Sequence, residues 1–502
     1  MSQVQAKPTS RWRRWAFRAA AVGLSLVPLL VVEGVLRAGG YGETSESGDP
    51  YVSFEGVQPL FVKNEAGDRY EIPKSRQEFF RPESFAAVKR PGEFRIFCLG
   101  GSTVQGRPYA IETSFTTWLE LSLNTVDAGR TWDVVNCGGV SYASYRLVPI
   151  LQEVLGHQPD LIVLYTGHNE FLEDRTYAAV QNTPRPVRAA HRALSNLRTY
   201  QALRNVVHGE ETKSVGPKLP KEVDAVLDYQ QGLDFYQRDD AWREGVIEHF
   251  DFNLRRMVRM AQAARVPVVL VQPVVNLKDC PPFKSESSNQ LSPEESQRFQ
   301  QLWQAAADLQ GEDLEQEIQL LKQAAQLDER HAGVHYFLGR CYFELRQYDK
   351  AKVEFQWALD EDICPLRILS PMQEIIRQVS YDFHVPLIDV EQRFQQQSPD
   401  GLPGRELMMD HVHPTVFGHQ LIADLLFQEL HAQGRVAPLE PFRSQRDARW
   451  LAHLESLDTE YFVRGQERLD GLMRWAAGRA RRVKLSKPEQ RNPSLSPQGK
   501  GS

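Results

Sequence analysis

The sequence predicts an α/β protein built around a three-layer sandwich, in which helices cover both faces of a parallel sheet. Five short, almost continuous apolar runs indicate strands that are buried on both faces, as in a parallel sheet. Helical stretches alternate with these runs, which gives the β-α-β order of such sandwiches. Glycine-rich or polar motifs follow the first three runs directly, at the strand ends where open α/β sheets bind their ligands.

The elements follow one another in a regular order from residue 94. Strands are expected at 94–99, 132–136, 161–165, 266–271 and 385–390. Helices are expected at 115–124, 145–155 and 246–264, each between two strands or before the next one. A further helix is expected at 416–430, with Pro414 in its first turn.

A chain of 502 residues exceeds what one hydrophobic core usually supports, so several regions are expected. They are a basic N-terminus (1–18), an anchor segment (19–38), an irregular linker (39–92), the first part of the α/β domain (93–285), an all-helical insert (293–365), the second part of the α/β domain (366–433), a helical extension (434–480) and a disordered basic tail (481–502). The polar segment 175–243 is expected to form a helical cover over the active face.

The N-terminus favours a membrane anchor. Five basic residues and no acid lie within 1–18, and an uncharged run follows at 19–32. A cleaved signal peptide fits less well, because the sequence around Ala38 is a poor cleavage site. A buried soluble helix is the other alternative, since fourteen uncharged residues are short for a full span. An uncleaved anchor would keep the N-terminus cytoplasmic and place the catalytic body in the periplasm or outside the cell.

The insert shows the spacing of a 34-residue tetratricopeptide repeat. The matching positions are Leu338, Gly339, Tyr342, Ala351, Phe355 and Ala358, and a degenerate earlier copy fits Ala305, Leu321 and Ala324. One or two repeats are fewer than the three or so that fold alone, so the insert is expected to lean on the α/β body. It is either a decoration of the fold or a surface for a protein partner.

Bulk properties exclude several classes of function. Without residues 1–18 the chain carries a net charge of −11, five units more negative than the whole, which argues against nucleic-acid binding. The five cysteines include no Cys-x-x-Cys pair, so a zinc ribbon is excluded, and Cys341 and Cys364 could pair in an oxidising compartment. No cofactor or metal is expected.

Three residues far apart in the sequence supply the parts of an acyl-transfer site. Ser102 follows two glycines at the end of the first strand, where a tight turn leaves its hydroxyl exposed. Asp410 and His413 lie three residues apart, so the carboxylate can hold the imidazole in one tautomer. These are the nucleophile, the orienting acid and the base of a serine triad.

Other interpretations of these motifs are a phosphate-binding loop, a different hydrolase turn, a helix cap and a metal site. The phosphate loop of nucleotide-binding proteins requires a lysine where Arg107 stands, and the elbow of α/β-hydrolases requires a glycine where Val104 stands. Ser102 could also be a simple helix cap. Asp410 and the neighbouring His411, His413 and His419 could bind a metal, although they lack the i, i+4 pair of a zincin helix.

Two further motifs could stabilise an oxyanion. Asn169 follows the third strand in Gly167-His168-Asn169, and a glycine turn ending in Gly139 follows the second. The asparagine amide and the N–H groups of Ser102 and Gly139 could together contribute several kcal/mol, since one such donor contributes ~3–4. Asn169 could instead only tie a loop.

These four blocks resemble the SGNH, or GDSL-type, esterases and lipases. The blocks here are Gly100-Gly101-Ser102, the run from Asn136 to Ser141, Gly167-His168-Asn169, and Asp410 with His413. The resemblance implies a flavodoxin-like sandwich, with Ser102 as nucleophile, His413 as base, Asp410 as its orienting acid, and Asn169 with a block-two N–H in the oxyanion hole. Gly101 and Glu170 replace aspartates of the family pattern. Ser141 stands where block two usually ends in glycine, which leaves Gly139 or Ser141 as the donor.

The expected function is therefore serine esterase activity on a small acyl ester, such as an O-acetyl group on an envelope polysaccharide. One alternative is an acyltransferase that uses the same triad and a sugar hydroxyl as acceptor. The other is an assembly factor that acts through its helical repeats. The expected contacts are an acylated small molecule or polysaccharide, a protein partner at the insert, and the membrane through the N-terminal helix, but no nucleic acid.

Overall fold

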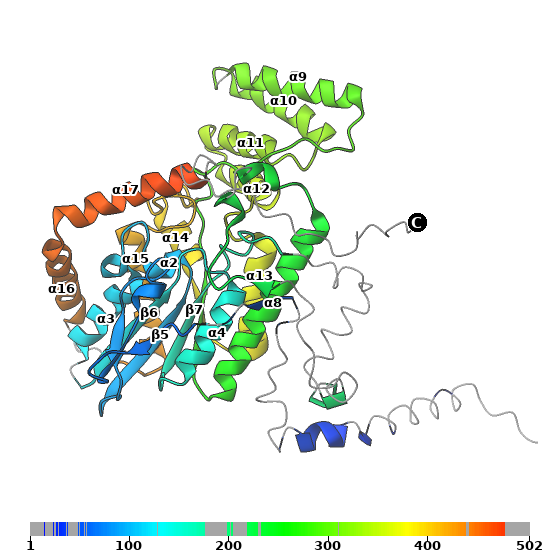
Figure 1. Cartoon of the computed structure of the whole chain (residues 1–502). Helices are drawn as coiled ribbons and strands as arrows, with labels where there is room; N and C mark the ends of the chain where they lie inside the picture. Colours follow the sequence, from blue (N-terminus) through cyan, green and yellow to red (C-terminus); the bar gives the residue numbers. More distant parts are fainter. Residues whose placement is uncertain are drawn as a thin grey trace, which may run out of the picture. The chain divides into compact units, whose positions relative to one another are not determined.

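The computed structural model describes residues 58–127, 129–175, 218–228, 232–309, 311–437 and 441–476, with scattered residues before 57 and between 198 and 203. The chain forms two compact units, one of residues 1–54 and 175–219 and one of residues 55–174 and 220–502. In the first unit, strands β1 (Ser53–Phe54) and β8 (Lys218–Leu219) pair in parallel. All other elements named below belong to the second unit (Figure 1).

A five-stranded parallel sheet forms the centre of the second unit. Its strands are β5 (Glu93–Gly100), β6 (Thr131–Gly138), β7 (Leu161–Tyr165), β9 (Val268–Gln272) and β10 (Leu387–Asp389), in the spatial order β10-β9-β7-β5-β6. Each coincides with a predicted strand. In the register, Gly100 lies opposite both Gly138 and Tyr165, so three carboxyl ends are level. The loops after these ends can therefore meet.

Helices pack in two groups because the side chains of a strand alternate between its faces. Ile96 and Cys98 share one core cluster with residues of α3 (Phe115–Val126) and α15 (Val416–Ala432). The other group contains α4 (Ser144–Leu155), α8 (Asp240–Ala263) and α13 (Ser370–Phe383), in which α4 and α13 each pack on α8 (Figure 1). Short elements complete the α/β body: α2 (Ser102–Gln105), α14 (Val390–Gln397), and the 3-10 turns η2 (Ile111–Thr113), η3 (Val226–Asp228) and η4 (Gly232–Phe235). The predicted α/β class is confirmed.

The insert is helical throughout, as predicted. It contains α9 (Pro293–Leu309), α10 (Leu314–Leu327), α11 (Ala332–Glu344) and α12 (Tyr348–Asp360), and each packs on the next (Figure 1). Gly339 admits the ring of Phe355, since a Cβ there would lie 2.7 Å from it. In the first, degenerate repeat the buried small residue is Ala306 rather than the predicted Ala305. The lobe leans on the body through the Tyr336 hydroxyl, which donates to the Lys278 carbonyl at 3.1 Å.

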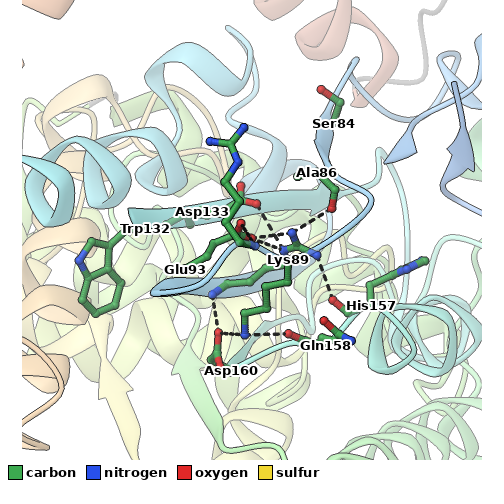
Figure 2. A network of polar contacts seen from close by, with 12 residues as sticks. Ser84, Ala86, Lys89, Glu93, Trp132, Asp133, His157, Gln158 and Asp160 are labelled. Atoms are coloured by element: carbon green, nitrogen blue, oxygen red, sulfur yellow. Dashed lines mark hydrogen bonds and ion pairs between the residues drawn. The ribbon is translucent and has the colours of Figure 1, made fainter. Parts of the chain in front are cut away.

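A polar network closes the amino ends of the central strands (Figure 2). The guanidinium of Arg95, which is 1% exposed, contacts Glu93 at 2.5 Å and Asp133 at 3.3 Å, and donates to the carbonyls of Ala86 and His157. Lys89 pairs with Asp160 beside it. A buried arginine is tolerated here because each side of its charge has a partner.

The segment 39–92 was expected to be irregular, and its described part is not. Strands β2 (Val62–Lys63), β3 (Arg69–Glu71) and β4 (Ser84–Ala86) form an antiparallel sheet, with the turn η1 (Lys74–Arg76) between β3 and β4. Phe61 and Phe85 anchor it, because their rings pack on each other and on Phe97 of β5. Strands of two or three residues are too short to show a period of two in the sequence.

The C-terminal extension forms two helices, α16 (Phe442–Ser456) and α17 (Thr459–Ala476). The tail 481–502, the basic N-terminus apart from Trp15, and nine of the twenty residues of the anchor segment 19–38 lie outside the described residues, as does most of the predicted cover before residue 218. Among the described residues, none of the helices combines the length and the apolar character needed to span a bilayer. The anchor stays a prediction.

Candidate active site

Ser102 stands at the level carboxyl ends of β5, β6 and β7, on the first turn of α2. Two glycines are needed before Ser102, because the backbone at 100 and 101 passes too close to neighbouring atoms for a Cβ. A Cβ on Gly100 would lie 2.1 Å from the Tyr165 carbonyl oxygen, and one on Gly101 would lie 2.4 Å from Asn169 Nδ2. The turn thus places the Ser102 side chain, which is 8% exposed, at the edge of the sheet.

The structure brings Ser102, His413 and Asp410 together in one chain of hydrogen bonds. Ser102 Oγ lies 2.7 Å from His413 Nε2, and Asp410 Oδ2 lies 2.6 Å from His413 Nδ1. The loop that carries the acid and the base is held by an isolated bridge between Met408 and Pro414. Pro414 was expected in the first turn of the next helix, but α15 starts at Val416 and Thr415 caps it, so Pro414 precedes the helix.

Asp410 is buried and remains ionised. Burial alone would raise its pKa, but the facing His413 and His411 rings and the hydrogen bonds it accepts hold the pKa below its ordinary value. Asp410 Oδ1 accepts the N–H groups of Val412 at 2.8 Å and His413 at 2.9 Å. With both oxygens engaged, the carboxylate can fix the imidazole and stabilise its protonated form, so that Nε2 can take the Ser102 proton.

Asn169 lies beside the serine, where the sequence places it. Its Nδ2 donates to the Tyr142 carbonyl at 3.0 Å and packs against Gly101. An amide nitrogen has two hydrogens, so one donor is left for a ligand. Asn169 and Ser102 line the same small cavity.

The structure corrects the assignment of Gly139 as an oxyanion donor. Its N–H already donates to the Gly100 carbonyl at 3.0 Å, and Gly139 does not line the cavity. Ser141, the alternative, does line it and has φ of +63°, a left-handed conformation that is uncommon outside glycine. Among the described contacts no acceptor takes the Ser141 N–H. Ser141 and Ser102 are therefore the available backbone donors.

The cavity is small, about 30 Å³, and includes residues that sequence reasoning did not assign to the site. Arg107 lies five residues after Ser102, and Leu472 and Trp475 come from α17 in the C-terminal extension. The Trp475 indole N–H donates to Asp228 at 2.8 Å, which fixes this end of the helix. None of the cavity-lining residues comes from the insert 293–365. These residues belong to none of the motifs in the sequence. The one signal is at Arg107, which stands where a phosphate loop would have its lysine.

The histidines around the triad do not form a metal site. Burial lowers the pKa of His411 to about 4, and that of His168 and His419 to about 3, so all three are neutral near pH 7. His419 faces Phe115 rather than Asp410, and its Nδ1 accepts the Phe115 N–H at 3.3 Å. Within the described part of the chain, no group of three or more His, Cys, Asp or Glu side chains could hold a metal ion. All five cysteines are free, so Cys341 and Cys364 do not pair.

Comparison with known proteins gives one family match, and it covers the insert. Residues 309–362 match the tetratricopeptide repeat, as the spacing predicts. None of the curated proteins searched matches the chain.

Solved structures resemble the chain only distantly. They include an acetyl xylan esterase (13% identity, TM-score 0.30, covering 67% of this chain and 100% of that one) and a lipase/acylhydrolase from Enterococcus faecalis (12%, 0.31, 69% and 99%). A GDSL-like lipase from Bacteroides thetaiotaomicron is 10% identical at a TM-score of 0.30, with 70% of this chain and 93% of that one covered. At such TM-scores these similarities establish no common fold.

Proposed function

We propose that this protein is a serine hydrolase that cleaves a small acyl ester, with Ser102 as nucleophile, His413 as base and Asp410 as the acid that orients it. The observation that carries this proposal is the continuous hydrogen-bond chain from Asp410 through His413 to Ser102. A serine hydroxyl within 2.7 Å of an imidazole that a buried carboxylate holds is the arrangement that activates a serine for acyl transfer.

The reaction has two balanced halves. In the first, Ser102 Oγ attacks the ester carbonyl while His413 Nε2 takes its proton. The tetrahedral intermediate then collapses, the ester C–O bond breaks, and the departing alcohol receives the proton from His413. In the second half, water attacks the acyl-enzyme while His413 Nε2 takes one of its protons. The bond between the acyl carbon and Ser102 Oγ then breaks, His413 returns the proton to Oγ, and the acid is released. The N–H groups of Ser102 and Ser141 and the Asn169 amide would stabilise the oxyanion in both halves.

A cavity of about 30 Å³ favours a small acyl group such as acetyl. The test uses 4-nitrophenyl acetate and a fluorophosphonate label on the purified protein. Ser102→Ala should abolish hydrolysis and labelling and shift the melting temperature by no more than a few degrees, because it removes one oxygen atom. Ser456→Ala, on the exposed end of α16, is the matched control. Labelling that persists in Ser102→Ala would contradict the assignment.

A sugar hydroxyl could replace water as the acceptor in the second half, which would make the protein an acyltransferase. Radiolabelled acetyl ester and an oligosaccharide acceptor separate the two outcomes, since label appears in acetate for hydrolysis and in the oligosaccharide for transfer. Either outcome requires the same three side chains.

The tetratricopeptide match favours a second role for the insert as a surface for a protein partner. Phe337 and Trp357 on this lobe remain 42% and 49% exposed and offer apolar surface to such a partner. Phe337→Ser should weaken partner crosslinking in the native source and leave ester hydrolysis unchanged, since the lobe does not line the cavity. A matching loss of hydrolysis would indicate instead that the lobe supports the fold.

A further inference from the structure

Arg107 is a cation beside the nucleophile, and it has no ion pair among the residues that the structure describes. It lines the cavity together with Ser102, and its backbone N–H donates to the Ser102 carbonyl at 3.1 Å. Its Nε is buried without a hydrogen-bond acceptor. Within the described part of the chain no carboxylate lies within ion-pair distance of its guanidinium.

Two more arginines strengthen this positive field. Burial and the nearby charges of Arg81 and Arg468 lower the pKa of Arg107 to about 10, which still leaves it charged at neutral pH. Arg81 also has a buried Nε without an acceptor. Arg468 donates only to the carbonyls of Pro108 at 3.0 Å and Tyr109 at 2.6 Å. None of the three has an ion pair among the described residues.

Two fully buried arginines of this chain, in contrast, form ion pairs within it. Arg95 is paired with Glu93 and Asp133 at the opposite edge of the sheet (Figure 2), and Arg146 is paired with Glu173 at 2.5 Å. The charge of Asp410 acts on Arg107, but the Asp410 oxygens already accept hydrogen bonds from His413 and two backbone N–H groups. A half-buried guanidinium without an ion pair among the described residues therefore has donors available for an anionic ligand.

We propose that Arg107 binds a carboxylate or phosphate group on the substrate next to the ester that Ser102 attacks. This inference rests on the proposed function and specifies its substrate class. The small cavity favours a small acyl group, so the anion belongs to the alcohol part of the ester. A guanidinium presents paired donors that match the oxygens of either anion.

Apolar side chains line part of the cavity beside Arg107, and they could contact the carbon skeleton that carries this anion. Leu472 and Trp475 of α17 line the cavity together with Leu366. An acidic sugar is the simplest substrate with an acylated hydroxyl and an anion on one ring. The overall charge of the chain is negative, so the positive field at this cavity is local. It would favour anions that reach the cavity and would not attract anions to the whole surface.

The experiment compares two esters that differ in one group, mono-O-acetylated methyl glucuronoside and mono-O-acetylated methyl glucoside. The intact protein should release acetate from the acidic sugar with the higher kcat/KM. Arg107→Gln should lower that value about ten- to hundredfold and change the value for the neutral sugar little, since a hydrogen bond to a charged group of this kind contributes a factor of this order. Arg464→Gln, on the same helix as Arg468 but exposed and paired with Glu460, controls for the change in net charge.

A binding measurement separates this inference from the proposed function. Isothermal titration of Ser102→Ala uses methyl glucuronoside, glucose 6-phosphate and methyl glucoside, and needs no turnover. Binding of one anionic sugar and not of the neutral one, lost in Ser102→Ala/Arg107→Gln, supports the inference and identifies carboxylate or phosphate. Equal affinity for all three sugars, or anion binding that survives Arg107→Gln, overturns it even if Ser102 cleaves esters. Absence of ester cleavage together with Arg107-dependent anion binding would overturn only the proposed function.

Discussion

The close approach of Gly101 to Asn169 makes a quantitative prediction. An alanine Cβ at position 101 would lie 2.4 Å from Asn169 Nδ2, about 1 Å inside ordinary contact distance. The backbone itself accepts alanine, because Gly101 has φ of −84° and ψ of −157° in the extended region. The neighbour that must yield is a side chain, so Gly101→Ala should fold and move the amide by about 1 Å.

That displacement should remove one oxyanion donor. Loss of one such donor costs ~2.7–4 kcal/mol in the transition state, or a factor of about 10²–10³ in kcat. Gly101→Ala should therefore reduce kcat for 4-nitrophenyl acetate by that factor and lower the melting temperature by only a few degrees. Gly100→Ala is the matched comparison, since its Cβ would lie 2.1 Å from the Tyr165 carbonyl oxygen and 2.3 Å from Val104 Cγ2. The Tyr165 backbone cannot move as easily as a side chain, so Gly100→Ala should lower the free energy of unfolding by ~3 kcal/mol or more.

A double-mutant cycle tests the cause. Asn169→Ala alone should lower kcat by a similar factor because it deletes the donor. Gly101→Ala/Asn169→Ala should then be no slower than Asn169→Ala, since the group displaced by the new Cβ is already absent. Full activity of Gly101→Ala, or additive losses in the double variant, would refute the assignment of Asn169 as an oxyanion donor.

Three more predictions concern buried ionisable groups. Asp410→Asn should lower kcat about 10³–10⁴-fold with little change in KM, because the amide cannot stabilise protonated His413; a loss below tenfold would contradict the orienting role. The folded pKa of His419, about 3, lies below its ordinary 6.5, so the free energy of unfolding falls as pH drops below 6.5. Urea unfolding should show that His419→Leu removes ~2 kcal/mol of the fall between pH 7 and 5. Burial raises the pKa of Glu83 from 4.5 to about 7, so the free energy of unfolding falls as pH rises across that range. Glu83→Gln should remove ~3 kcal/mol of that fall. Unchanged pH slopes in both variants would contradict the burial of these groups.

One physical reason explains why the sequence predicts both the sheet and the proximity of residues that are far apart in the chain. Strands buried on both faces must be apolar at every position, so they are visible as continuous runs. Once those runs are assigned to one parallel sheet, their carboxyl ends share an edge, and Ser102 and Asn169 must lie near each other. The approach of Asp410 and His413 to Ser102, across more than 300 residues, was inferred from chemistry rather than from the pattern, and the structure places His413 Nε2 2.7 Å from Ser102 Oγ.

The donor in block two could not be chosen from the sequence because it depends on one backbone conformation. Glycine at 139 suggests a left-handed turn, yet the residue with positive φ there is Ser141. Gly139 is needed for space instead, since a Cβ would lie 2.7 Å from the Tyr142 ring. The sequence does not show whether a glycine is required because a side chain would clash or because φ is positive, and only coordinates distinguish the two cases.

Arg107 and α17 show what a pattern of residue types omits. The helical period at 444–480 predicts a helix but not the surface on which it lies, so nothing indicates that Leu472 and Trp475 line the cavity. The same limit applies to arginine. Arg95 and Arg107 are each a single basic residue near β5, and only their surroundings separate them, since Arg95 has carboxylates and carbonyls around it and Arg107 has none among the described residues. Because burial makes every unmatched charge costly, the absence of partners is itself information about a ligand, and it becomes available only when the fold is known.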